Sequence, residues 1–230
     1  MTEPSANPIE VELIADLACP WCYLGLARLD RARAARPHLA VHLRWRPFLL
    51  NPHLPPEGMD RRAYLRAKFG GAAAAQRVYQ RIEEAGRTDG VTFAFDRMQR
   101  TPNTVLAQRL LLYAEQHGLG DPMMRALFRA LFEEGRDLGD PAELLELGAA
   151  VGLERETLEA FLASDERADE IVASHRWAER LGVQGVPVFL VDRAHIIAGA
   201  QPPEVLTGLL DLAAQRAGST LDAEAAPAAG

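Results

Sequence analysis

Cysteine is almost absent from this chain, which has only two cysteines among 230 residues. Two cysteines cannot build the disulfide framework of a small secreted domain. Both belong to one Cys-X-X-Cys motif, Cys19-Pro20-Trp21-Cys22. In a reducing compartment a single motif of this kind is either redox-active or half of a metal site.

Three further absences narrow the class of protein. No stretch approaches the roughly 18 apolar residues that a membrane-spanning helix needs. Residues 1–8 are polar and lack the apolar segment of a signal peptide, so we expect a cytoplasmic protein without membrane contact. The net charge is −7 and no basic block is present. A nucleic-acid partner is therefore not expected, because phosphate contacts need clustered Lys and Arg.

The remaining composition is typical of a globular domain. Hydrophobic residues make up 48% of the chain, which is enough for a full core. The predicted order is strand–helix–strand, then many helices, then a hairpin and a last helix. This order predicts an α/β core interrupted by a helical insertion. We place the core at residues 1–55 and 182–217, the insertion at 56–181 and a flexible tail at 218–230.

Hydrophobic periodicity locates the individual elements. It predicts strands at residues 9–18, 39–48, 186–191 and 195–198. It predicts helices at residues 19–36, 61–69, 73–85, 104–117, 140 to about 152, 155–163, 165–181 and 202–216. It also predicts a helix that begins at residue 121. Asp140 and Glu143 resemble a capping box at the start of one of these helices.

The Cys-X-X-Cys motif lies at the predicted junction of a strand and a helix. Cys19 is expected at the helix N-cap and Pro20 in the first turn. The positive end of a helix stabilises a thiolate, so Cys19 is expected to be the more acidic and accessible thiol. Cys22 follows one turn later, where its sulfur can return to Cys19. One thiol can then attack a disulfide while the other resolves the mixed disulfide.

Neither chance nor zinc binding accounts well for the motif. Two cysteines placed at random seldom lie three residues apart at a strand-to-helix junction. A zinc site would need two more ligands. The only closely spaced histidines, His38 and His42, straddle a strand start. We therefore expect neither a metal nor a bound cofactor.

Three positions outside the motif are candidates for the site. Asp16, on the strand that leads into Cys19, could exchange a proton with the thiols if it is buried; otherwise it is a structural strand-end residue. Val186-Pro187 is either an edge-strand proline or a cis-proline loop whose Val186 backbone pairs with an extended substrate. Asn103 either binds a thiol substrate or caps a helix.

In combination, these features resemble the DsbA family of thioredoxin-fold proteins, and most closely its cytoplasmic FrnE-like branch. The resemblance covers about residues 10–214. Its motifs are DLACPWCYLG at residues 16–25, RPFLLNP at 46–52, Asn103-Thr104, LFRALFEEGRDLGD at 127–140, GVQGVP at 182–187 and GAQP at 199–202. It implies an α/β thioredoxin-like fold with a large helical insertion, a nucleophile at Cys19, a resolving thiol at Cys22 and a cis-proline at Pro187.

This sequence also departs from the family pattern. Trp21 stands where extracytoplasmic DsbA proteins usually have a histidine, so that histidine's support of the thiolate is missing. The second cysteine pair of some FrnE-like proteins is absent as well. The residues expected to contact substrate are Pro20, Trp21, Asn103, Val186 and Pro187.

The leading prediction is a thiol–disulfide oxidoreductase acting on protein or small-molecule disulfides. We expect a monomer or a homodimer, and glutathione is a candidate co-substrate. The alternative is a glutathione-dependent transferase or an enzyme like 2-hydroxychromene-2-carboxylate isomerase. Such enzymes need one activated group at position 19 and no resolving thiol, so the presence of Cys22 favours the redox function.

Overall fold

The structure of the chain is a computed structural model that describes residues 8–224. The side chains of Ala72 and of residues 217–224 are not described. Residues 1–7 and 225–230 lie outside the described part. Of the predicted tail at 218–230, the backbone is described only for residues 218–224.

A four-stranded sheet with the order β2-β1-β5-β6 forms the centre of the fold. The strand β1 (Ile9–Ala15) runs parallel to β2 (Val41–Pro47) and antiparallel to β5 (Val188–Val191). The edge strand β6 (His195–Ala198) pairs with β5. Both central strands are almost entirely buried, which explains why they are continuous apolar runs in the sequence.

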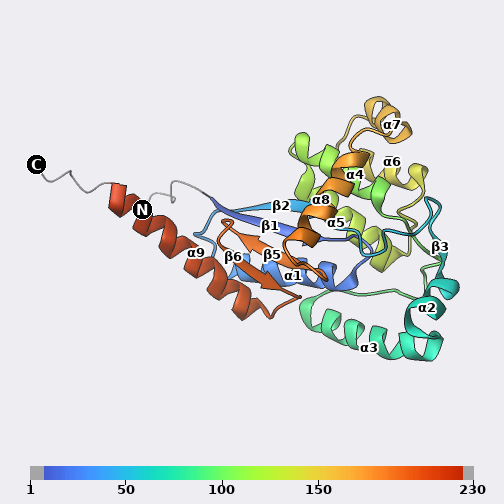
Figure 1. Ribbon diagram of the computed structural model, residues 1–230, viewed down its shortest axis with the longest axis horizontal. Coiled ribbons are helices and arrows are strands. Elements are labelled where there is room, and N and C mark those ends of the chain that lie inside the picture. The colour runs from blue at the N-terminus through green and yellow to red at the C-terminus, as the bar shows by residue number, and fades with distance from the viewer. Residues whose placement is uncertain (1–7, 225–230) are drawn as a thin grey trace, which may run out of the picture.

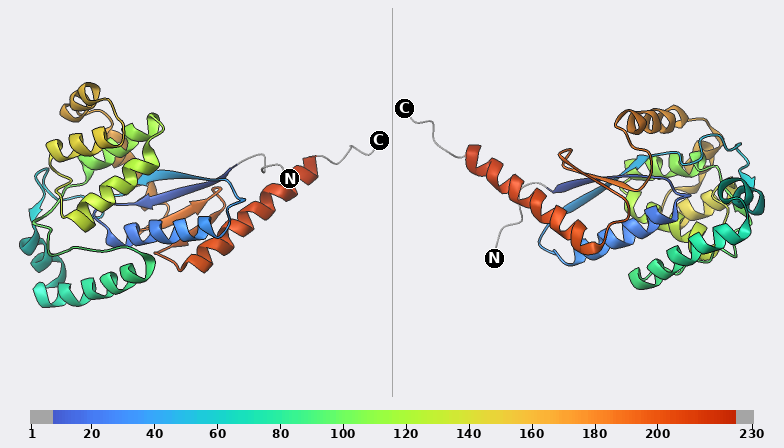
Figure 2. Two further views of the ribbon diagram at one scale, coloured as in Figure 1. Left: turned by 180° about the vertical axis from the view of Figure 1, so that it is seen from behind. Right: turned by 60° about the horizontal axis from the view of Figure 1, so that its bottom comes forward.

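Two helices that are distant in sequence lie side by side against this sheet (Figures 1 and 2). The helix α1 (Pro20–Ala34) follows β1 directly, and α9 (Pro203–Glu224) closes the chain. Proline at the first helical position of α1 costs no hydrogen bond, because that N–H would have no partner in the helix. The sheet and these two helices thus come from the two ends of the chain.

The intervening residues form a helical insertion at the end of the sheet where β1 leads into α1 (Figure 1). Its helices are α2 (Arg61–Phe69), α3 (Ala72–Asp89), α4 (Val105–Gln116), α5 (Gly120–Arg129), the π-helical turn η1 (Ala130–Glu134), α6 (Pro141–Ala150), α7 (Arg155–Ala163) and α8 (Ala168–Arg180). Two short strands, β3 (Met59–Asp60) and β4 (Arg100–Thr101), pair antiparallel. The fold is therefore the predicted α/β thioredoxin-like fold with a helical insertion.

Several details differ from the sequence-based expectations. Helix α9 continues to Glu224, eight residues beyond the predicted helix end at residue 216, and so extends into the predicted tail. Asp140 caps α6 by accepting the Ala142 N–H at 2.9 Å, but Glu143 pairs with Arg136 instead of closing a capping box. The strands β3 and β4 were not expected, because two residues are too few to show an alternating pattern. The exact domain boundaries stay a prediction.

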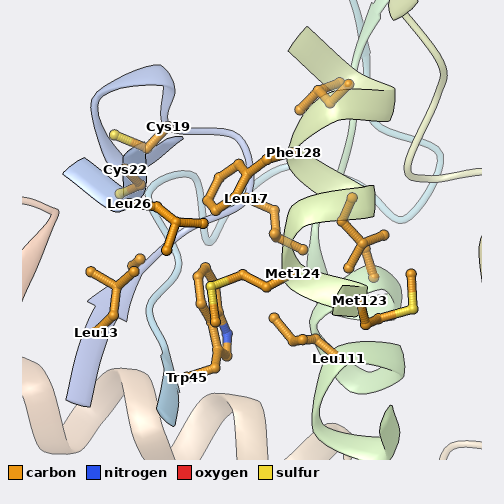
Figure 3. Close-up of a cluster of buried hydrophobic side chains, with 14 of the residues drawn as sticks. Leu13, Leu17, Cys19, Cys22, Leu26, Trp45, Leu111, Met123, Met124 and Phe128 are labelled. Atoms are coloured by element: carbon orange, nitrogen blue, oxygen red, sulfur yellow. The ribbon is translucent and has the colours of Figure 1, made fainter. Parts of the chain in front are cut away.

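One apolar core joins the sheet to the insertion (Figure 3). Leu13 and Trp45 from the sheet pack with Leu111, Met124 and Phe128 from α4 and α5. Because this core is continuous, the insertion is held firmly against the start of α1. None of the helices within residues 8–224 is long and apolar enough to cross a membrane.

Candidate active site

Cys19 and Cys22 lie at the start of α1, as the sequence predicts. Cys19 is the N-cap residue with an extended backbone, and the Cys22 N–H donates to the Cys19 carbonyl at 2.9 Å. Both thiols are free and belong to the edge of the apolar core (Figure 3). Cys19 is 4% exposed and Cys22 is completely buried. Cys19 is therefore the more exposed of the two buried thiols.

The thiol of Cys19 faces the loop at Val186 and Pro187. Its Sγ donates a weak hydrogen bond to the Val186 carbonyl at 3.5 Å, and the Val186–Pro187 peptide bond is cis. A glycine on α1 permits this close approach: a Cβ added at Gly25 would lie 3.1 Å from the Pro187 ring and 3.2 Å from Phe189. The fold thus brings together residues that are 167 positions apart.

The surface around the thiols is partly apolar. Trp21, between the two cysteines, is 38% exposed. Val186 and Pro187 also line an apolar cavity of about 450 Å³, together with residues that include Leu181 and Ile196. Side chains of an extended substrate that ran along this loop would find apolar contacts there.

Asp16 is buried just before the cysteine motif, with only 1% of its surface exposed. Its Oδ1 accepts the Ala18 N–H at 3.0 Å and the Thr104 hydroxyl at 2.8 Å. Its Oδ2 accepts the Leu50 N–H at 2.6 Å. The sequence left open whether Asp16 is buried near the thiols as a proton-transfer group or is a solvated or hydrogen-bonded strand-end residue. The structure shows that it is buried and hydrogen-bonded, and its part in proton transfer stays a prediction.

Burial dominates the acid–base properties of both Asp16 and Cys22. Burial raises the pKa of the Asp16 carboxyl, although its three hydrogen bonds and the charge of Lys68 oppose that rise. Burial also raises the pKa of the Cys22 thiol well above its ordinary value, and the neighbouring Cys19 adds to the increase. A hydrogen bond with the Asp16 backbone opposes this rise in pKa, whereas the charge of the Asp16 carboxyl adds to it. The raised pKa favours the protonated form of the Cys22 thiol, and the charge of the Asp16 carboxyl acts on this thiol.

Asn103 is occupied with contacts inside the protein. Its Oδ1 accepts the N–H of Val105, the first residue of α4, at 3.0 Å. Its Nδ2 donates to the Leu54 carbonyl at 2.8 Å. Both ends of the amide thus support the start of α4 and the loop beside it, so the structure favours the helix-start role. Substrate binding by Asn103 stays a prediction.

Two site residues were not identified from the sequence. Thr104 and Gln108, at the start of α4, belong to the hydrogen-bond network of Asp16. A signal for Gln108 was available, because it is a polar residue inside the apolar run of residues 105–112. A buried glutamine must find hydrogen-bond partners, and such a requirement often reflects a specific site.

A known protein family matches nearly the whole chain. Residues 10–211 match the family model described as a DSBA-like thioredoxin domain. The chain belongs to this family. It is a DsbA-like protein with the cysteine pair Cys19–Cys22, as the resemblance in the sequence implied.

Three individual proteins are similar to this chain to different degrees. The structure is similar to that of the probable DsbA oxidoreductase SCO1869 from Streptomyces coelicolor, with 35% identity, 89% of each chain covered and a TM-score of 0.81. The uncharacterized protein YwbO of Bacillus subtilis (strain 168) is 24% identical over 86% of this chain and 93% of its own length. A 2-hydroxychromene-2-carboxylate isomerase shares the fold at 16% identity, covering 93% of this chain and 98% of its own, with a TM-score of 0.64.

Proposed function

We propose that this DsbA-like protein is a dithiol–disulfide oxidoreductase that acts on protein or small-molecule disulfides. The observation that carries the proposal is the placement of two free thiols at the start of α1, with Cys19 against the Val186 carbonyl and Cys22 buried beside Asp16. A second thiol one helical turn after Cys19 is suited to a two-step exchange, in which it resolves the mixed disulfide.

The reaction written in the direction of substrate reduction begins at Cys19. Its thiolate attacks one sulfur of the substrate disulfide, and the other substrate sulfur leaves as a thiolate and takes up a proton. The Val186–Pro187 loop lies beside the mixed disulfide, where it can support an extended substrate. Trp21 and Pro20 border the same place.

The second step needs the buried thiol. Asp16 removes the proton from Cys22, and the Cys22 thiolate attacks the Cys19 sulfur of the mixed disulfide. The bond between Cys19 and the substrate breaks, the Cys19–Cys22 disulfide forms, and the second substrate sulfur leaves as a thiolate. Two electrons pass from the cysteine pair to the substrate. The reverse sequence oxidises a dithiol substrate.

The fold does not separate this function from the glutathione-dependent alternative, because the isomerase shares it. The presence of Cys22 favours the dithiol function. A transferase or isomerase would use position 19 to polarise glutathione and would have no task for a buried thiol one turn later. The FrnE-like branch, a cytoplasmic location, the use of glutathione and the oligomeric state stay predictions.

The decisive experiment compares Cys22→Ser with Cys19→Ser. Cys22→Ser should accumulate covalent mixed disulfides, visible by mass spectrometry, and should lose turnover in a disulfide-reduction assay. Cys19→Ser should lose both adducts and turnover. Full turnover by Cys22→Ser without any trapped adduct would favour the transferase or isomerase.

A further inference from the structure

The start of α4 sends two polar side chains into the buried space at the end of β1. Thr104 is 5% exposed and Gln108 is completely buried. Gln108 Nε2 donates to the Phe48 carbonyl at 3.0 Å and to Thr104 Oγ1 at 3.1 Å. Thr104 in turn donates to Asp16. The helical insertion thus reaches the proton acceptor through two consecutive hydrogen bonds.

The donor and the acceptor of each hydrogen bond in the series from Phe48 to Asp16 can be assigned. The Phe48 carbonyl can only accept, so the amide end of Gln108 that faces it must be the NH₂ group. That NH₂ group also faces Thr104 Oγ1, which must therefore be an acceptor there. The single Thr104 proton is left to point at Asp16. The alternative amide orientation would set two acceptors against each other at Phe48.

This orientation of the Gln108 amide lowers the stability of the folded protein, which indicates that the hydrogen bonds from Phe48 to Asp16 have a function. Gln108 Oε1 is buried and has no partner among the described residues. An unpaired buried acceptor is unfavourable by roughly 1 to 3 kcal/mol. A leucine or methionine at this position would avoid that cost, whereas Gln108 accepts it and keeps Thr104 oriented as a donor.

We propose that Thr104 and Gln108 are positioning residues that set the pH at which Asp16 can take the proton of Cys22. The proposal rests on the proposed function, in which Asp16 accepts that proton before Cys22 attacks the mixed disulfide. A hydroxyl that can only donate favours the carboxylate over the carboxylic acid, so it keeps Asp16 ready as a base.

Other charged groups around Asp16 do not replace this contact. The Cys22 thiol on α1 and Lys68 on α2 interact with Asp16 through their charges. Cys19 contacts Asp16 through the backbone, where its N–H donates to the Asp16 carbonyl at 3.0 Å. From α8, His175 receives the Leu49 N–H at 3.3 Å and faces Glu179, so it touches the loop beside Asp16 rather than the carboxyl itself. Among the side chains that the structure describes, Thr104 is the only hydrogen-bond donor to Asp16.

The test measures the resolving step against pH in Thr104→Val, which keeps the shape of the side chain and removes its hydroxyl. The reduced protein is mixed with excess glutathione disulfide, and formation of the Cys19–Cys22 disulfide is followed by rapid quenching. Loss of the donor should move the midpoint of the rate profile upward by about one pH unit. Below the midpoint the rate should fall about tenfold, and at high pH it should return to that of the natural protein.

Three variants make the result specific. Thr104→Ser restores the hydroxyl and should return the midpoint. Thr207→Val removes a threonine that donates to the Pro203 carbonyl on α9, far from Asp16, and should leave the profile unchanged. Gln108→Met removes the donor to Thr104 and should shift the midpoint in the same direction by a smaller amount, which also decides the question if Thr104→Val does not fold.

The outcomes separate this inference from the proposed function. If the natural protein forms no Cys19–Cys22 disulfide, the proposed function is wrong. If the disulfide forms but Thr104→Val and Gln108→Met both keep the natural midpoint, only the role of Thr104 and Gln108 is wrong. A uniform loss of rate at every pH would show a structural role and would equally overturn the inference.

Discussion

The first turns of α1 and α4 are built in a similar way but serve different purposes. Cys19 and Thr104 are the N-cap residues of their helices, and neither side chain caps its own helix. Cys19 instead donates to the Val186 carbonyl, and Thr104 donates to Asp16. Neither side chain therefore stabilises the helix that it precedes. In the mechanism proposed above, the reacting groups belong to one helix start, and the donor that sets the acid–base behaviour of Asp16 belongs to the other.

Asp16 lies between these two helix starts, so its replacement should have the largest effect. Asp16→Asn removes the proton acceptor for Cys22, and the resolving step near neutral pH should slow by about 10²-fold. Rapid-quench measurement of Cys19–Cys22 disulfide formation checks this. Asp140→Asn is the matched control, because Asp140 accepts a backbone N–H at an exposed helix start. A natural rate in Asp16→Asn would exclude Asp16 from proton transfer.

The same variant should change how stability depends on pH. Because burial raises the pKa of Asp16 in the folded state, the folded protein holds this proton to a higher pH than the unfolded chain does. The free energy of unfolding should therefore fall as pH rises from the unfolded value through the folded one. Urea unfolding at several pH values should show this decline in the natural protein, and a smaller one in Asp16→Asn.

The difference between the two cysteines should appear as a difference in alkylation. Cys22 is completely buried and its pKa is raised, whereas Cys19 has a small exposed surface at the helix start. Each pH unit by which the Cys22 pKa is raised lowers its thiolate fraction about tenfold. Iodoacetamide at mildly acidic pH should label Cys19 at least about tenfold faster, as peptide mass spectrometry would show. Faster labelling of Cys22 would reverse the assigned roles.

These two helix starts also show what a sequence can and cannot predict. Residues 16–25 carry the reacting thiols, the proline and the strand-to-helix junction in one short segment, so local patterns were sufficient. The contact between Asp16 and Thr104 joins residues 88 positions apart. Periodicity placed Thr104 at the start of a helix, but the packing of that helix against β1 depends on the whole core. The π-helical turn η1 was missed for a similar reason, because the apolar stripe continues through it.

The close approach of α1 to the Val186–Pro187 loop depends on Gly25. A Cβ there would lie 3.1 Å from the rigid Pro187 ring and 3.2 Å from the fully buried Phe189, so neither neighbour can yield easily. Gly25→Ala should destabilise the protein by about 1 to 3 kcal/mol and lower disulfide exchange. Chemical unfolding and the turnover assay measure the two effects.

Gly208→Ala provides the matched control for Gly25→Ala. Gly208 lies inside α9 and a Cβ there would meet nothing within 4 Å. Alanine at such a position should stabilise the helix by about 0.5 to 1 kcal/mol, with no effect on exchange. If Gly25→Ala behaved like this control, the helix and the loop would not be held in close contact.

The smallest expected effect concerns Asn103, the neighbour of Thr104. Asn103 Oδ1 accepts the Val105 N–H, which supplies α4 with the cap that Thr104 does not provide. Asn103→Ala should therefore lower the free energy of unfolding by about 1 kcal/mol and leave KM for the disulfide substrate unchanged. Asn103→Asp keeps the acceptor for Val105 and loses the donor to Leu54, so it should recover part of that stability. An increase in KM in both variants, with stability unaltered in Asn103→Asp, would instead make Asn103 a substrate-binding residue and would give the start of α4 a direct part in binding.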